Sequence, residues 1–456
     1  MEKVKKIIDI LFFVGLILIP FTQISGIELL REYAHESAIY CWLLGGTLVL
    51  LDDIFVKKRI EFPLKSKIIL FWSAFFVWCL LSYMFNFTEI QSNYFKFRTG
   101  NNRFVFQIIS LFLPSYFLVY YFTNVFKRRG IKNSFMQIRK VLLCTFYFVF
   151  AYAVVELWGG KLDSAFARSI IEVFNLLPVL NKTEYYGSRL SSVSFEVPAL
   201  GNYLIFIYGW MFSYVFTASI WYKKFLPSIL VIALTLLSGA RAALVIVLFQ
   251  VILGWILYVK VTEIKINYKI LFSVLITLFV IGIMNRDTVN SVLEEKMNFF
   301  DVEHSISNKT RYGMQYSSLM VFKENPVVGV GFGQNGFHKQ NHYPEWAVKD
   351  NYEFTDWYLN DEVYNFAPDF NLYTRLLAET GIIGLVLFLV FLGFVLKESY
   401  LLLRMSNEIK VLGIVLLLSF VGLIINWLQI DFFRQFGFWI CLSLLVVLVN
   451  GKEIRI

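Results

Sequence analysis

Residues 411–429 read VLGIVLLLSFVGLIINWLQ, a run without a single charged side chain. At 1.5 Å per residue, a helix of this length crosses a hydrocarbon layer of about 30 Å. Lipid offers the backbone no hydrogen-bond partner, so such a segment is expected to be helical. Similar apolar blocks lie near 7–25, 37–56, 67–86, 103–125, 141–158, 198–220, 225–240, 242–259, 270–286, 376–396 and 436–450. The sequence therefore predicts an all-α polytopic membrane protein with about twelve transmembrane helices.

The composition supports this fold class. Hydrophobic residues make up 58% of the chain, and charged residues make up only 16%, against about 25% in an average soluble domain. The net charge of +9 comes largely from short loops between the apolar blocks. It indicates membrane topology rather than a nucleic-acid partner.

The positions of Lys and Arg predict the orientation, because positively charged short loops remain in the cytoplasm. With the N-terminus inside, the inner loops hold more than half of the 42 Lys and Arg residues, concentrated at 57–67, 127–140, 260–269 and 397–410. Both termini are then expected in the cytoplasm. Residues 1–286 would form helices one to nine with a medium external loop at 159–197. A large external loop at 287–370 would precede helices ten to twelve in residues 371–456.

The large loop is rich in aromatic side chains, with ten between Tyr343 and Tyr373, interspersed with carboxylates such as Asp356 and Asp361. This mixture is typical of surfaces that stack on sugar rings and hydrogen-bond their hydroxyls. It is equally typical of an aromatic belt at the membrane interface. Composition alone leaves both interpretations open.

Neither a disulfide nor a metal site is expected. All four cysteines fall within predicted spans, and these are Cys41, Cys79, Cys144 and Cys441. His338 and His342 lie four residues apart, but the surrounding segment lacks helical periodicity and contains Pro344. We therefore predict no metal ion and no cofactor.

At 238–241 the chain reads SGAR, so a cation lies where one predicted span ends and the next begins. Arg241 could extend its side chain to the membrane interface, as long basic side chains commonly do. Alternatively, its planar guanidinium could bind phosphate oxygens in a bidentate way. The residues alone favour neither interpretation of Arg241 strongly.

Two segments border the large loop. The glycines of NPVVGVGFG at 325–333 lack the strand, helix and acidic residue of a nucleotide-binding turn, so a tight turn is the better interpretation. DFNLYTRLLAETGIIG at 369–384 runs from the loop into a helix and carries Arg375 and Glu379. A carboxylate near a helix N-terminus is also expected from the helix dipole alone.

Four segments together resemble the bacterial O-antigen polymerase and O-antigen ligase superfamily. They are RLSSVSFEVPALGNYL at 189–204, LTLLSGARAAL at 234–244, RYGMQYSSLMVFKENPVVGVGFG at 311–333 and NLYTRLLAETGIIGL at 371–385. The resemblance implies a glycosyltransferase of the bacterial inner membrane that acts on the periplasmic face without nucleotide sugar or metal. The external loops at 159–197 and 287–370 would then be periplasmic. Its donor and acceptor would be oligosaccharides linked to undecaprenyl pyrophosphate in the membrane lipid, and a protein that regulates chain length would be a further partner.

The resemblance also implies roles for individual residues. Arg241 matches the family's arginine at the helix junction and would bind the pyrophosphate, whose growing charge must be stabilised. Arg189 and Arg311 fall in two other family segments and would contact pyrophosphate or acidic sugars. Asn371, Arg375 and Glu379 fall in the fourth segment and are further candidates for substrate binding.

The chain departs from the ligase pattern at Phe370. The resemblance implies that ligases of this family carry a histidine there, followed by a polar residue, which here is Asn371. Nine residues separate Asn371 from GIIG at 381–384. Phenylalanine cannot accept a proton, which favours a polymerase over a ligase. Asp369 and Glu196 are the candidates for a general base, and catalysis without a base stays open.

We therefore expect a surface-polysaccharide polymerase that transfers a growing glycan from one lipid carrier to the repeat unit on another. The alternatives are an O-antigen ligase, a flippase for lipid-linked oligosaccharides, and a protein whose loop only binds a partner.

Overall fold

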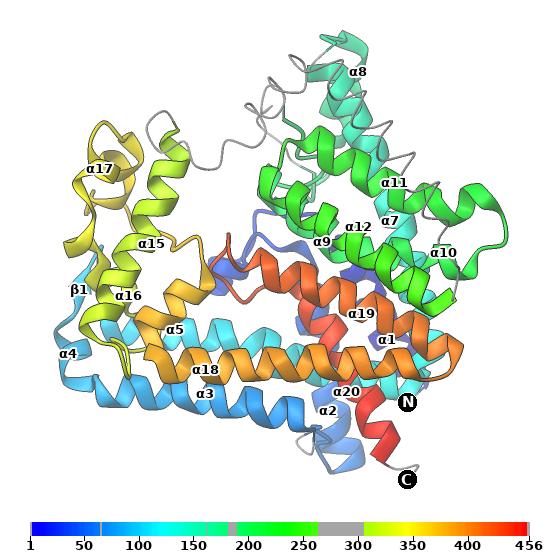
Figure 1. Ribbon diagram of the computed structural model, residues 1–456, viewed down its shortest axis with the longest axis horizontal. Coiled ribbons are helices and arrows are strands. Elements are labelled where there is room, and N and C mark those ends of the chain that lie inside the picture. Colours follow the sequence, from blue (N-terminus) through cyan, green and yellow to red (C-terminus); the bar gives the residue numbers. More distant parts are fainter. Residues whose placement is uncertain (1, 64–65, 161, 181–188, 263–304, 454–456) are drawn as a thin grey trace.

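The computed structural model describes residues 2–63, 66–160, 162–180, 189–262 and 305–453, and these residues form a predominantly helical molecule (Figure 1). The helices are α1 Glu2–Leu18, α2 Ser37–Leu51, α3 Lys67–Phe85, α4 Phe87–Ser92, α5 Gly100–Phe112, α6 Val119–Arg129, α7 Ile131–Gly160, α8 Ala165–Phe174, α9 Val197–Phe212, α10 Tyr214–Thr217, α11 Trp221–Ser238, α12 Arg241–Thr262, α15 Ile306–Glu324, α16 Asn335–His338, α17 Glu345–Val348, α18 Leu372–Leu401, α19 Asn407–Asn426 and α20 Phe436–Glu453. Short 3-10 or π segments lie at Glu28–Tyr33, Asp52–Lys57, Leu113–Leu118, Lys339–His342, Glu353–Tyr358 and Leu402–Arg404. The strands β1 Tyr94–Phe95 and β2 Arg98–Thr99 form a hairpin.

Nine helical segments of the described residues are long and apolar enough to cross a membrane, and Phe436–Gly451 is a shorter apolar helix. These segments coincide with ten of the predicted spans. The prediction near 7–25 corresponds to α1, which ends earlier, at Leu18. Pro20 explains this end, because a proline disfavours helical geometry in the residue before it. The span predicted at 270–286 lies outside the described residues.

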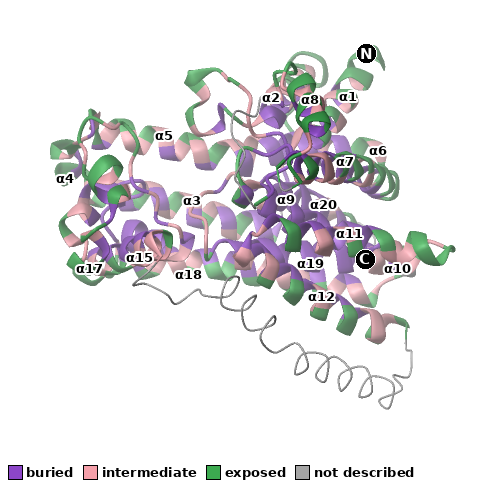
Figure 2. Cartoon of the chain, turned by 90° about the horizontal axis from the view of Figure 1, so that it is seen from above, coloured by how far each residue is buried: buried purple, intermediate pink, exposed green. Residues whose placement is uncertain are grey.

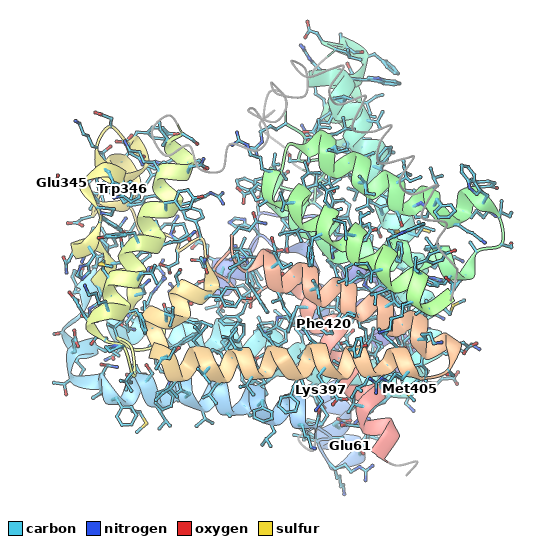
Figure 3. The ribbon with its side chains drawn as sticks, viewed as in Figure 1. Glu61, Glu345, Trp346, Lys397, Met405 and Phe420 are labelled. Carbon is cyan, nitrogen blue, oxygen red and sulfur yellow. The ribbon has the colours of Figure 1, made fainter. Side chains whose placement is uncertain are left out.

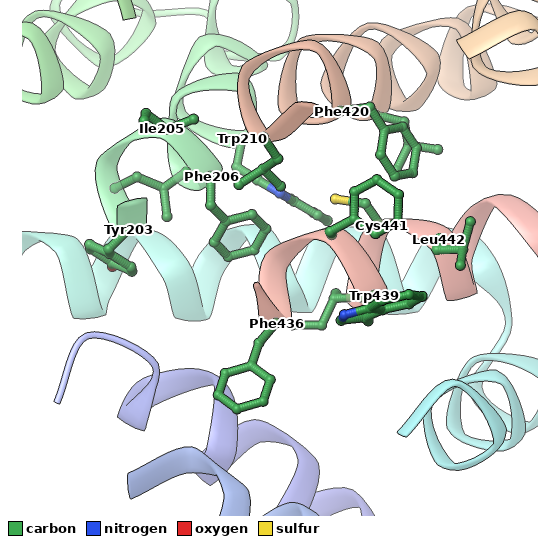
Figure 4. Close-up of a cluster of buried hydrophobic side chains, with 14 of the residues drawn as sticks. Tyr203, Ile205, Phe206, Trp210, Phe420, Phe436, Trp439, Cys441 and Leu442 are labelled. Atoms are coloured by element: carbon green, nitrogen blue, oxygen red, sulfur yellow. The ribbon is translucent and has the colours of Figure 1, made fainter. Parts of the chain in front are cut away.

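The core of the bundle surrounds α20, which packs against α6, α9 and α19. All of its residues from Phe436 to Val446 are buried, as expected of a helix that is apolar on all sides. Cys441 lies beside Trp210 of α9, whereas Trp439 projects from the other side of α20 (Figure 4), where its ring packs against that of Trp72 with centroids 5.0 Å apart. The buried residues concentrate where α9, α19 and α20 meet (Figure 2).

Polar contacts gather at two opposite ends of the bundle. At one end, Asp9 pairs with Arg128 and Arg129, and Lys132 pairs with Glu408 at 2.6 Å. All these loops were predicted to face the cytoplasm. Figure 3 shows Glu61, Lys397 and Met405 toward this end of the long α18, whereas Glu345 and Trp346 lie at the other.

The predicted large loop is structured where it is described. Residues 306–324 form the helix α15 rather than irregular chain, and its polar sequence explains why no apolar block revealed it. Of the loop's aromatics, Phe354 is buried in a small core against Met314 and Ala347. Others, including Trp357 and Tyr364, are exposed.

The loop is anchored to α18 where that helix is interrupted at Gly381, whose φ is +64°. The interruption frees main-chain carbonyls, and the turn at 325–333 satisfies two of them: Val330 N–H donates to Ala378 at 3.0 Å, and Gly331 N–H donates to Glu379 at 3.0 Å. The Trp78 indole of α3 donates to a third carbonyl, at Thr380. Buried carbonyls without partners are costly, so the turn and the helix break depend on each other.

Gly329 in this turn tests that dependence. Its φ is +73°, and a Cβ there would lie 2.5 Å from the main-chain carbon of Glu379. We predict that Gly329→Ala lowers the free energy of unfolding by about 1–3 kcal/mol, because both strain and overlap oppose a side chain. Thermal unfolding of the detergent-solubilised protein measures this.

Gly393→Ala is the matched control, because a Cβ at Gly393 of α18 meets no atom within 4 Å. It should be neutral or slightly stabilising, since alanine favours helix over glycine. Equal unfolding temperatures for the two variants would contradict the proposed anchoring.

Candidate active site

The predicted site residues separate into two groups in the structure. Arg189, Glu196, Arg241 and Arg311 lie at the end of the bundle that was predicted to face the periplasm. They belong to the segment before α9, the α11–α12 junction and α15. The other four predicted residues belong to a buried network at the start of α18.

The α11–α12 junction places Arg241 at a helix N-terminus. Gly239, with φ of +69°, ends α11 in the left-handed conformation, and α12 begins two residues later at Arg241. Arg189 donates a hydrogen bond to the Gly239 carbonyl at 3.3 Å. Burial lowers the pKa of Arg189, and the positive charge of Arg241 lowers it further. Two guanidinium groups beside a helix N-terminus favour an anion between them.

Glu196 precedes α9 and is the carboxylate of this group. Its side chain is exposed and its carboxyl makes no side-chain capping bond to α9. The surrounding protein raises the pKa of Glu196, while the charges of Arg311, Arg434 and Arg189 oppose the shift. A proton acceptor must reach its substrate, and the exposure of the Glu196 side chain allows this.

Arg311 stacks on the ring of Phe370, with its guanidinium carbon 4.8 Å from the ring centroid. Phe370 has a φ of +52°, a left-handed conformation that a bulky residue rarely adopts. Burial lowers the pKa of Arg311, whereas Glu196 and Glu353 oppose this. Phe370, which stands where ligases of the family carry a histidine, thus contacts Arg311, which was predicted to bind substrate.

Asp369 lies in a buried ion pair. Its Oδ1 accepts hydrogen bonds from Lys339 at 2.8 Å, Ser318 at 2.8 Å and Asn335 at 2.7 Å. The side chains of Lys339 and Asp369 are only 1% and 7% exposed. A buried charge needs such partners, so these contacts favour a structural role for Asp369 over that of a general base.

The remaining predicted residues organise the start of α18. The Asn371 side chain caps the helix by accepting from the N–H groups of Tyr373 and Thr374, a common function of asparagine at this position. Arg375 pairs with Glu379 at 3.2 Å, and both are buried. Neither belongs to the first group of predicted residues, Arg189, Glu196, Arg241 and Arg311, which we call the accessible group.

The structure also reveals charged residues that the sequence analysis missed. Glu32 accepts hydrogen bonds from Gln107 at 2.7 Å and Ser110 at 3.0 Å. Burial raises its pKa, but Arg434, Arg103 and Arg375 outweigh that effect and lower it. Arg103 and Gln107 are polar positions inside an apolar span, a signal that could have identified this cluster.

Arg434 joins the Glu32 cluster to the accessible group. Its Nε lies 3.4 Å from the Glu36 carboxylate, and its charge acts on both Glu32 and Glu196. Within the described ranges, no three His, Cys, Asp or Glu side chains are arranged to hold a metal ion.

The fold and this site define a polytopic membrane protein with an arginine-rich polar site at one end of its helical bundle. Residues 226–389 match the family described as O-antigen ligase. The match covers about a third of the chain and is consistent with the O-antigen polymerase and ligase superfamily of membrane glycosyltransferase-like enzymes. It confirms the resemblance seen in the sequence. A comparison with curated proteins finds no match to the chain.

The matched region runs from α11 into α18 and contains Arg241, Arg311 and the buried network around Asp369. Arg189 and Glu196 lie outside it. The structure therefore brings together residues from inside and outside the matched region.

The ion pair of Lys339 and Asp369 gives a direct test of the role of Asp369. We predict that Asp369→Ala lowers the free energy of unfolding by about 3–5 kcal/mol, because it leaves Lys339 buried without its carboxylate. Denaturation in detergent measures this loss.

Asp361→Ala is the control, because Asp361 is an exposed carboxylate of the same loop and should change stability by less than about 0.5 kcal/mol. Normal stability of Asp369→Ala combined with lost glycan transfer would contradict the structural role and favour that of a base.

Proposed function

We propose that this protein is a surface-polysaccharide polymerase of the bacterial inner membrane, working on the periplasmic face with both termini in the cytoplasm. The observation that carries the proposal is the convergence of Arg189, Arg241 and Arg311 near Glu196. Such a site suits a reaction in which a pyrophosphate leaves. The family match over residues 226–389 supports lipid-linked glycans as substrates.

The proposed reaction joins two glycans carried on undecaprenyl pyrophosphate. A hydroxyl oxygen of the acceptor sugar attacks the anomeric carbon of the donor, and the bond from that carbon to the pyrophosphate oxygen breaks. The configuration at the anomeric carbon is inverted. The hydroxyl proton passes to a base, and the bonding electrons leave with the lipid pyrophosphate.

Arg241 and Arg189 are proposed to bind the departing pyrophosphate. Negative charge increases on its bridging oxygen as the bond breaks, and guanidinium groups fixed beside a helix N-terminus stabilise that charge without reorganising. Cationic side chains are sufficient for this role, so the proposal requires no metal ion or cofactor.

Glu196 is the proposed general base. Arg311 is proposed to contact the acceptor glycan or the donor glycan. Glu196 is accessible and flanked by arginines, which suits a carboxylate beside an anionic substrate. Asp369 is the less suitable candidate because Lys339, Ser318 and Asn335 already occupy its Oδ1.

Phe370 supports polymerase over ligase activity. A phenylalanine supplies no imidazole, and its ring instead lies against Arg311. Phe370 thus contacts Arg311, another residue of the proposed active site. A protein that regulates chain length is a further proposed partner.

Deletion of the gene from its bacterium tests the function. A polymerase predicts surface glycan with a single repeat unit on its anchor, because each repeat is still exported and attached. Bare anchor with accumulating lipid-linked polymer would indicate a ligase instead. Repeat units trapped on the cytoplasmic face would indicate a flippase.

Complementation with Arg241→Ala should reproduce the deletion at normal protein level, with transfer reduced about 10²–10³-fold, as for other removed transition-state contacts. Arg241→Lys should restore only part of the activity, since lysine lacks the planar fork. Arg404→Ala, which changes an exposed arginine at the opposite end, is the control. Normal chain lengths from Arg241→Ala would overturn the role of Arg241.

Substitution of Phe370 tests the stacking on Arg311. Phe370→Leu keeps an apolar side chain but removes the ring, and we predict a several-fold loss of transfer, in line with about 0.5–1 kcal/mol for a cation–π contact. Phe370→Tyr keeps the ring and should transfer normally. A loss that is the same in both variants would contradict the proposed contact, provided that both unfold at the wild-type temperature.

A further inference from the structure

An elongated groove runs between α1 and α7 on the outer surface of the bundle. Two adjoining cavities form it, with volumes of about 610 and 380 Å³. Both are lined by Phe13 and Ile17 of α1 and by Gln137 of α7. The groove is remote from Arg241 in the fold, because it lies between other helices and extends toward the opposite end of the bundle.

The lining follows one face of each helix. On α1 and just beyond it, Lys6, Ile10, Phe13, Ile17 and Phe21 recur at helical spacing. Side chains at this spacing share one face. From Lys6 to Phe21 the groove spans roughly 20 Å at 1.5 Å per residue, which exceeds half of the hydrocarbon thickness of about 30 Å.

The α7 wall continues the same pattern. Gln137, Val141, Cys144 and Phe148 line it at intervals of three or four residues. Away from its polar mouth the groove is mostly apolar, and Phe148 and Cys144 are exposed to it. An apolar channel of this length suits the acyl chain of a lipid.

The polar residues concentrate at one end, which we call the basic mouth: Lys6, Asp9, Arg129, Gln137 and Lys140. Asp9 pairs with Arg129, so the cations exceed the carboxylates there. The Nζ of Lys6 lies 3.7 Å from Oε1 of Glu2, and both side chains are largely exposed. Such surface ion pairs contribute little to stability. The basic mouth therefore keeps a net positive charge.

We propose that this groove binds an anionic phospholipid of the cytoplasmic leaflet. Its acyl chain would lie along Phe13, Ile17 and Phe148, and its phosphate would be held by Lys6 and Lys140. The positively charged loops predicted to face the cytoplasm include this mouth, and basic pockets between helices on that side suit anionic headgroups. The inference stands independently of the proposed polymerase activity.

Titration of the full-length protein in detergent with phosphatidylglycerol, followed by native mass spectrometry, tests the site. Phosphatidylcholine with identical acyl chains is the uncharged comparison. Phosphatidylglycerol should bind more tightly, and Lys6→Gln or Lys140→Gln should each weaken it about fivefold, as expected for about 1 kcal/mol per lost charge. Lys223→Gln, which changes an exposed lysine outside the groove, should leave binding unchanged.

Cys144 provides a second measurement on the unaltered protein. Its thiol is exposed in the groove, whereas Cys79 and Cys441 are buried. Phosphatidylglycerol should slow its alkylation by a lipid-soluble maleimide more than phosphatidylcholine does, with Cys144→Ser identifying the labelled position. The proposal would be overturned if the two lipids bound equally, or if Lys223→Gln weakened phosphatidylglycerol binding as much as Lys6→Gln and Lys140→Gln do. Tighter binding of undecaprenyl phosphate to the same lysines would also overturn it.

Discussion

The interruption of α18 at Gly381 is the constraint on which the half of the structure that contains residues 305–370 depends. A broken helix inside a protein leaves carbonyls without partners, and here the turn at 325–333 and Trp78 satisfy them. That docking fixes the end of α15 and the chain that returns to Phe370. Arg311 on α15 is thereby held against Phe370. This contact helps to position the accessible group, to which Arg311 belongs.

Burial of charge accounts for the division of polar residues into two groups. Asp369, Lys339, Arg375 and Glu379 are enclosed by protein and are matched with one another or with amides. Their pairing stabilises the junction between loop and bundle. Arg189 and Glu196 are exposed and Arg311 is half-buried, and this greater access suits groups that contact a charged substrate.

The sequence predicted the membrane-spanning helices well because their signal is local: each apolar block reports its own helix. It could not predict α15, whose polar surface has no such signature. Nor could it separate Asp369 from Glu196, since Glu196 falls in one family segment and Asp369 lies just before another. Distinguishing them required the partners of each side chain, and Lys339 lies thirty residues from Asp369 along the chain. Glu32 was missed for the same reason, whereas the polar residues Arg103 and Gln107 inside an apolar span were a local signal of its cluster.

The most direct test of the account is transfer by the purified protein in proteoliposomes supplied with a single undecaprenyl-pyrophosphate-linked repeat unit. The account predicts a ladder of lipid-linked oligomers, with one undecaprenyl pyrophosphate released for each repeat added and no requirement for nucleotide sugar. A ladder that fails to form with intact substrate on the lumenal face, or glycan that is transferred only to a lipid A core acceptor, would contradict it.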